Sequence, residues 1–307
     1  QKPLVHRVAE ARKLKSLARE KGLVTQMGIQ VHSSMAYRMA THFIQSGAIG
    51  KVSDVHVWSF KSWGYDGPAI TGEDPVPDTL DWNLWLGTAP ERAYKKGAFH
   101  PGEWRKFLDY GCGTLGDMGV HIFDTPFSAL GLVPPNWVET TCREPNGYSH
   151  PGKNIVRYGF SETDYTTKEL LWTWYDGKYA PPKDVEDLAM PDGRKLPDQG
   201  AMFVGEKGRM LLPHVGGPMF LPRSITKSLK KPDLAPADHY HQWIDAIDGK
   251  GEPSAGFDYS ADLTETVLLG TIGNRFPGKR LEWDKKAMAF SNLSEANALV
   301  GGEYRKF

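Results

Sequence analysis

The chain has 307 residues, and its 37 Lys and Arg balance its 37 Asp and Glu, so its formal net charge is zero. A nucleic-acid-binding protein would carry a basic excess, and the balance argues against that class. With 40% hydrophobic and 24% charged residues, the composition is that of a water-soluble globular protein with a sizeable core. Cys112 and Cys142 are too few for a disulfide framework or a zinc quartet, and we interpret them as reduced thiols.

The first part of the chain alternates predicted helices and strands. Apolar residues recur at helical spacing from Leu4, and short runs of β-branched and apolar residues follow each helix. Such alternation is typical of a doubly wound sheet, of which only the end would be present here. The predicted elements are a helix over Leu4–Leu17 ended by Gly22, a strand at Leu23–Gln30, a helix capped by Ser33 or Ser34 that runs to Ser46 and Gly47, and a strand at Val52–Phe60.

The remainder of the chain predicts strands without helices between them, which implies antiparallel pairing. We expect Tyr65–Trp104 to be an ordered excursion, because its many aromatic residues need burial. The fold class predicted is α/β plus α+β: the end of a doubly wound βαβ sheet, then an open, mainly antiparallel sheet with helices on one face. The predicted elements are strands at Trp137–Arg143, Ile155–Ser161 and Glu169–Trp174, a loop at Pro181–Gln199, a hairpin of Ala201–Val204 and Gly208–Leu212, and helices at Ala237–Ile247 and Tyr259–Gly270.

The segment Gly111–Asp124, GCGTLGDMGVHIFD, allows two incompatible interpretations. Its glycines spell G-x-G-x-x-G, the spacing of a phosphate-binding loop, but the preceding EWRKFLDY is too charged for the buried strand that such a loop needs. Alternatively, Asp117 and His121 share one face of a helix. Asp117 would then accept a hydrogen bond from one ring nitrogen of His121 and leave the other free as a proton acceptor. A buried Asp–His pair without chemistry explains the spacing equally well.

Taken together, the motifs resemble the glucose–fructose oxidoreductase, inositol dehydrogenase and MocA (Gfo/Idh/MocA) family along essentially the whole chain. The resemblance implies a nicotinamide-dependent oxidoreductase of sugars, polyols and related molecules, with a Rossmann domain and a C-terminal antiparallel sheet that often forms the oligomer interface. The motifs are Lys2-Pro3 before a helix, Gly28-x-Gln30, Trp104-Arg105, the Gly111–Asp124 segment, LDWNLWLG, the GEKG hairpin, FDYSADLTETVLLG and the closing EYRKF.

The same resemblance implies a domain division. Residues 1–31 would end an NAD(P)-binding Rossmann domain, and residues 32–307 would form the α+β substrate and oligomerisation domain, with a final helix and tail that pack back on the first part. The family's glycine fingerprint would precede residue 1. We therefore expect a fragment or a truncated product that lacks most of the Rossmann domain and its pyrophosphate cradle.

Site residues are carried over by position. The family's catalytic residues match Lys2, Asp117 and His121, with His121 as general base, Asp117 orienting it, and Lys2 donating to the reacting oxygen and sharing the base role. Its cofactor contacts match Gln1, Lys2, Gln30, Trp104 and Arg105. Gln1 replaces the usual acid before the lysine. The implied cofactor is NAD or NADP, a choice made by a strand that this sequence does not contain.

Other polar residues give weaker candidates. His239 and His241 alternate near a helix start, but nothing supplies a third ligand at suitable spacing, so we predict no metal. His32, Tyr37 and Arg38 follow the strand at Leu23–Gln30 and could contact the substrate, but we favour a solvated helix face for them.

Three functions are consistent with these residues. The first is an NAD(P)-dependent oxidoreductase that acts on CH–OH, the second a redox-neutral NAD-dependent glycosidase of the same family, and the third a non-catalytic binding or assembly module. Expected partners are a small carbohydrate substrate and further copies of the chain, as a dimer or tetramer. No membrane partner is expected, since no apolar run has the length of a membrane span and no signal peptide is visible. We take the compartment as cytoplasmic by default, with an export signal upstream of Gln1 as the alternative.

Overall fold

One mixed sheet of nine strands organises residues 1–306, the part of the chain that the computed structural model describes. The strand order is β7-β6-β5-β1-β4-β3-β2-β8-β9, and every neighbouring pair is antiparallel except β1 and β4. The strands are β1 Val52–Ser59, β2 Trp137–Thr141, β3 Ile155–Phe160, β4 Thr166–Asp176, β5 Gln199–Gly205, β6 Gly208–Pro213, β7 Met219–Leu221, β8 Arg280–Asp284 and β9 Ala289–Phe290.

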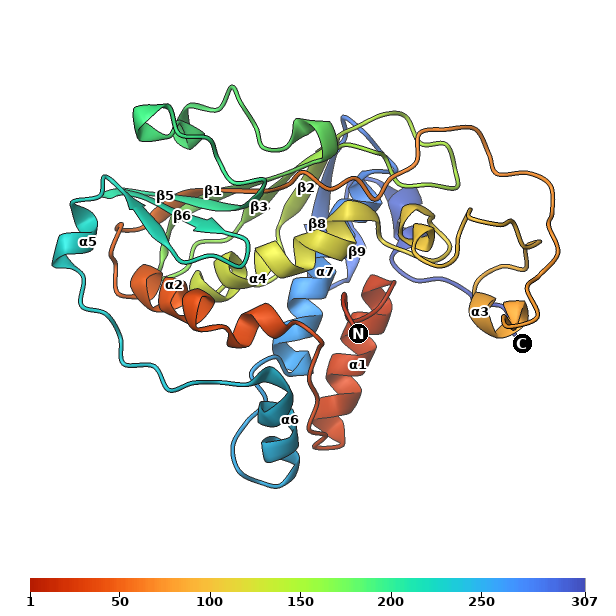
Figure 1. Cartoon of the computed structure of the whole chain (residues 1–307), viewed down its shortest axis with the longest axis horizontal. Coiled ribbons are helices and arrows are strands. Elements are labelled where there is room, and N and C mark those ends of the chain that lie inside the picture. Colours follow the sequence, from red (N-terminus) through yellow and green to blue (C-terminus); the bar gives the residue numbers. More distant parts are fainter. Residues whose placement is uncertain (307) are drawn as a thin grey trace.

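Helices cover one face of this sheet. Figure 1 shows α2, α4 and α7 along that face, with α1 packed beside α7. Gly22 follows α1 in the left-handed conformation, and the Ser34 hydroxyl accepts a hydrogen bond from the Tyr37 amide at the start of α2, so both predicted helix boundaries are confirmed. The helices are α1 Val8–Glu20, α2 Met35–Gln45, α3 Trp82–Leu86, α4 Val120–Ala129, α5 Ile225–Ser228, α6 His239–Ile247 and α7 Phe257–Gly273. Within residues 1–306, no helix has the length and apolar character needed to cross a membrane.

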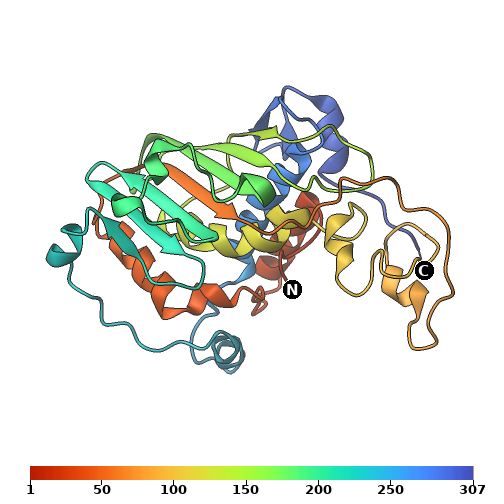
Figure 2. The same cartoon turned by 45° about the horizontal axis from the view of Figure 1, so that its top comes forward.

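The other face of the sheet is partly covered by the segment that connects β4 to β5 (Figure 2). Trp58 of β1 is fully buried there, and its indole nitrogen donates to the carbonyl of Pro197 at 2.7 Å. Val55 and Val57 of the same strand are buried in the core with the helices. β1 is therefore covered on both sides, and its apolar residues Val55, Val57 and Trp58 are fully buried although they face opposite sides of the sheet.

The strand predicted at Leu23–Gln30 is wrong. The Met27 amide donates to the carbonyl of Ala255 at 2.9 Å, and the Gly28 amide donates to that of Gln1 at 3.4 Å. These bonds join the segment to two separate loops and not to a neighbouring strand. A strand needs a neighbour with which to pair, and the described residues place none beside this segment. The predicted alternation of helices and strands is therefore broken at this segment. The strand predicted at Val52–Phe60 lies at the centre of the mixed sheet.

The other predicted strands are confirmed, with small changes of boundary. β2, β3 and β4 pair antiparallel, and β5 and β6 form the hairpin around Glu206 and Lys207. The parallel pairing of β1 with β4 was not predicted, nor were β7, β8 and β9. The class of a mixed open α/β sheet with helices on one face is confirmed.

The aromatic excursion after β1 is ordered, as predicted. Trp82 and Trp85 stack with ring centroids 4.6 Å apart, and Phe99 packs edge-on against Phe107 at 4.8 Å. The C-terminal tail reaches this excursion and α1, as Figure 1 indicates near α3. Val300 accepts from the Ala9 amide at 3.0 Å, and Arg305 donates to the carbonyl of Ala89 at 3.0 Å. The last residue of the predicted tail, Phe307, lies outside the described residues.

Candidate active site

A single turn of π-helix, Leu115–Gly119, leads directly into α4. The glycines of this segment are needed for close packing. A Cβ atom on Gly111 would lie 2.6 Å from the Arg105 backbone, and one on Gly113, which has φ +64°, would lie 2.9 Å from His150. Protein atoms thus occupy the space in which a phosphate would have to sit, so the structure favours the helix interpretation over the phosphate loop.

Asp117, on the π-turn, accepts hydrogen bonds from two cations. The Lys2 ammonium lies 2.7 Å from Asp117 Oδ1 and 2.7 Å from the carbonyl oxygen of the same residue, and Arg105 Nε lies 3.0 Å from Oδ1. Burial acts to raise the pKa of Asp117, but the hydrogen bonds and charges of Lys2 and Arg105 outweigh it, so the pKa falls below its ordinary value. The Arg105 guanidinium lies 4.6 Å from the ring centroid of Trp104.

The expected hydrogen bond between Asp117 and His121 is wrong. The described part of the chain contains no such bond, and His121 Nδ1 is buried without a partner. The i, i+4 rule assumes an α-helix, and the π-turn at Asp117 changes the side-chain spacing so that the carboxylate meets Lys2 and Arg105 instead. Asp117 therefore positions two cations and does not fix the tautomer of His121.

His121 is held neutral by its surroundings. Burial, and then the charges of Lys2 and His214, lower its pKa to about 4. At neutral pH the imidazole is therefore a free base. Its other ring nitrogen, Nε2, has no hydrogen-bond partner among the described residues and is not buried.

A cavity of about 180 Å³ brings most of the predicted site together. Gln1, Lys2, Trp104, Arg105 and Asp117 all line it. His121 and Gln30 are not among its lining residues. The Gln30 side chain instead donates to the Tyr240 hydroxyl at 2.9 Å, so the structure does not bring Gln30 into this cavity.

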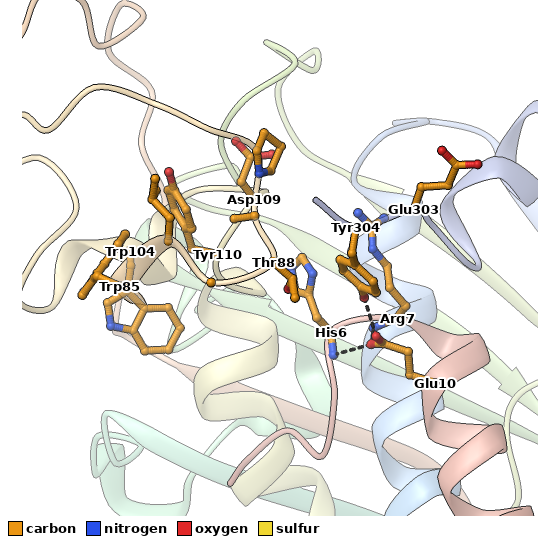
Figure 3. A pocket seen from close by; sticks show the side chains of 14 residues that line it. His6, Arg7, Glu10, Trp85, Thr88, Trp104, Asp109, Tyr110, Glu303 and Tyr304 are labelled. Carbon is orange, nitrogen blue, oxygen red and sulfur yellow. Dashed lines mark hydrogen bonds between the residues drawn. The ribbon is translucent and has the colours of Figure 1, made fainter. Parts of the chain in front are cut away.

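A larger cavity of about 730 Å³ adjoins the first, since His6, Trp104 and Tyr110 line both. Figure 3 shows the aromatic side chains Trp85, Trp104 and Tyr110 on one side, and the start of α1 with the C-terminal tail on the other. Glu10 joins the tail to the helix, because its carboxylate accepts from the Tyr304 hydroxyl and from the His6 amide. The two cavities together form a continuous polar and aromatic surface.

Two further residues lie at this site: His214, which was missed from the sequence, and Tyr37, for which a solvated helix face was favoured over substrate contact. The ring of His214, after β6, lies 6.1 Å from that of His121 between centroids, and the Tyr37 hydroxyl lies 2.9 Å from His214 Nδ1. Tyr37 is only 3% exposed, so its assignment to a solvated helix face is wrong. The available sequence signal was the turn His214-Val215-Gly216-Gly217, which marks where a strand ends but not what lies beside it.

The histidine pair considered for a metal has other contacts. His239 Nδ1 lies 2.8 Å from the Ser33 hydroxyl, and its Nε2 lies 2.9 Å from the carbonyl oxygen of Met27. Both ring nitrogens are thus used to hold α6 against the segment before α2. Among residues 1–306, no group of three or more His, Cys, Asp or Glu side chains could hold a metal ion.

Residues 38–132, which include the Asp117 turn, match the family model described as "Oxidoreductase family, C-terminal alpha/beta domain". That model belongs to the Gfo/Idh/MocA oxidoreductase family, and this part of the chain is similar to the family's C-terminal domain. The resemblance inferred from the motifs is confirmed. Comparison with curated protein sequences gives no match.

Solved structures share the fold of this chain at low identity. The WlbA dehydrogenase of Bordetella pertussis, in complex with NADH and UDP-GlcNAcA, is 13% identical with a TM-score of 0.58 over 92% of this chain and 70% of its own. An NAD-binding protein of Listeria innocua is 11% identical, with a TM-score of 0.55 over 92% and 73%. The aldose-aldose oxidoreductase of Caulobacter crescentus is 13% identical, with a TM-score of 0.53 over 92% and 70%.

The protonation of His121 gives a direct test of this geometry. In a ¹⁵N-detected NMR titration, we expect its imidazole to stay neutral from pH 8 to pH 5 and to take up a proton near pH 4. Because the unfolded chain binds this proton more readily, the contribution of His121 to stability should fall as the pH drops below about 6.5. Lys2→Met should raise the pKa of His121, since it removes a nearby positive charge. Titration of His121 at pH 6 or above would contradict the burial described here.

Proposed function

We propose that the protein is an NAD(P)-dependent oxidoreductase that moves a hydride between a nicotinamide cofactor and a CH–OH carbon of a sugar, polyol or related carbohydrate. The observation that carries the proposal is the convergence of Lys2, Arg105 and Asp117 on one cavity close to a neutral His121. The match to the family model supports the oxidoreductase class. The NADH and sugar-nucleotide complex of the WlbA dehydrogenase supports the cofactor and the carbohydrate by analogy alone.

The residues of the smaller cavity fit the nicotinamide end of such a cofactor. The cavity has about 180 Å³, and the flat Trp104 and Arg105 side chains on its wall suit a planar ring. Gln1, Lys2, Trp104 and Arg105 would hold it. When bound, the nicotinamide supplies the hydride acceptor or donor. We include in the proposal that residues 1–31 belong to the cofactor domain and the following residues to the substrate domain.

The side chains of this chain supply the proton chemistry. An ammonium group has three N–H donors, and Lys2 uses two of them on Asp117, so one stays available for a substrate oxygen. There it would stabilise the negative charge that develops as the carbinol loses its proton. His121 is uncharged and accepts that proton at Nε2, its accessible nitrogen.

The test is cofactor reduction by the purified chain. We expect tryptophan fluorescence quenching on titration with NAD⁺ or NADP⁺, because Trp104 lines the cavity, and a rise in absorbance at 340 nm with at least one member of a panel of aldoses and polyols. Cleavage of a nitrophenyl glycoside without net cofactor reduction would replace the proposal with the redox-neutral glycosidase. Sugar binding with no cofactor binding, both by the chain and by a fusion that adds a complete Rossmann domain before residue 1, would favour a binding module.

A further inference from the structure

The turn that follows β6 has an unusual backbone. The Gly216 amide donates to the carbonyl of Pro213 at 2.9 Å, which closes a four-residue turn, and Val215 occupies its third position with φ +57°. That position normally takes glycine, and a β-branched residue there is strained by about 1–3 kcal/mol. The Val215 side chain is 76% exposed, so its packing does not compensate for the strain.

The strained turn aims the Val215 amide at Tyr37. That amide donates to the Tyr37 hydroxyl oxygen at 2.9 Å. The Tyr37 hydroxyl proton has no other acceptor among the described residues, so the arrangement that satisfies it is donation to His214 Nδ1, also 2.9 Å away. Nδ1 of His214 is therefore an acceptor, and the proton of the neutral ring is on Nε2.

His214 presents that nitrogen at the candidate active site. Nε2 has no hydrogen-bond partner among the described residues and is not buried, and the ring lies 6.1 Å from that of His121 between centroids. Burial, and then the charges of Lys61 and Lys2, lower the pKa of His214, so the ring is a neutral donor.

We propose that His214 is a substrate-binding residue whose Nε2–H donates to the hydroxyl next to the one that His121 deprotonates, so that the site selects vicinal diols. Tyr37 is the positioning residue that fixes the donor tautomer. The proposal rests on the proposed function, because it takes His121 as the base at the reacting carbon. It adds a specificity element from the C-terminal sheet and α2 that the family match does not supply.

The first test needs no turnover. In ¹⁵N–¹H imidazole spectra of the full chain, we expect His214 in the Nε2–H tautomer, and Tyr37→Phe should convert it to a mixture, since the phenol proton is lost. Titration with myo-inositol or D-glucose should shift the His214 Nε2 signal more than cyclohexanol does, because cyclohexanol has no vicinal hydroxyl. An unchanged tautomer in Tyr37→Phe, or equal responses to all three probes, would overturn the proposal.

The second test uses the reaction. With the best vicinal-diol substrate, we expect His214→Ala to raise KM about tenfold, the effect of one lost hydrogen bond, while kcat changes less. His214→Gln, which keeps an N–H donor, should recover part of the loss, and the exposed His241→Ala serves as control. Normal KM in His214→Ala would remove this proposal and leave the proposed function intact. A diol-dependent shift of the His214 signal without any cofactor reduction would support this proposal and contradict the proposed function.

Discussion

Replacement of Glu265 with alanine is expected to lower the free energy of unfolding by about 3–5 kcal/mol, the cost of leaving a buried ion-pair partner alone. Glu265 lies in the middle of α7 and is only 1% exposed. Its two carboxylate oxygens accept from Arg12 of α1 at 2.6 Å each, and one of them accepts from the Trp283 indole of β8 at 2.9 Å. The Glu265 carboxylate thus joins α7 to α1 and to β8.

Asp262, one turn earlier on α7, provides the matched control. It pairs with Lys15 of α1 at 2.6 Å, but both side chains keep about a quarter of their surface in water. Asp262→Ala should therefore cost about 1 kcal/mol or less. Urea unfolding followed by circular dichroism measures both variants. Equal losses in the two would show that Glu265 contributes no more than an exposed pair.

Replacement of His121 with alanine is expected to lower kcat by about 10²–10⁴-fold with the best substrate, the usual contribution of a general base. KM should change less, because the proton is transferred only in the transition state. The wild-type rate should stay constant from pH 8 down to about pH 5 and fall as His121 takes up a proton near pH 4. Steady-state cofactor reduction across this pH range provides the measurement.

Two controls at other residues, His241 and Cys112, accompany the His121→Ala measurement. His241→Ala removes an exposed imidazole on α6 and should leave kcat unchanged. Cys112 lines the smaller cavity, and burial raises the pKa of its thiol to about 12, so a thiol reagent at neutral pH should not abolish activity. A His121→Ala enzyme with more than half the wild-type kcat would rule out His121 as the base.

The sequence predicts best where local chemistry decides the structure. Gly22 and Ser34 mark helix ends because a left-handed glycine and a capping hydroxyl act within one turn of chain. The segment Leu23–Gln30 was mispredicted because strand formation depends on a pairing partner, which a local pattern cannot supply. The parallel pairing of β1 with β4 was missed for the same reason, since the two strands are separated by the excursion, α4, β2 and β3.

In the candidate site, too, features that depend on local sequence were predicted and features that depend on distant contacts were not. Lys2, Trp104, Arg105 and Asp117 were located by motif, and they line one cavity. The Asp117–His121 bond was mispredicted because a π-turn cannot be told from an α-turn by spacing alone. His214 was missed and Tyr37 was placed on a solvated face, because the contact between them depends on the turn at Val215, which is distant from α2 in the sequence.

The position of β1 has a consequence for how the protein is made. β1 is synthesised before both of its neighbours in the sheet, because it pairs with Thr166–Asp176 on one side and with Gln199–Gly205 on the other. Until both have been synthesised, β1 has two open edges. The centre of the sheet therefore forms only after β5 has been made, and such non-local pairing slows folding.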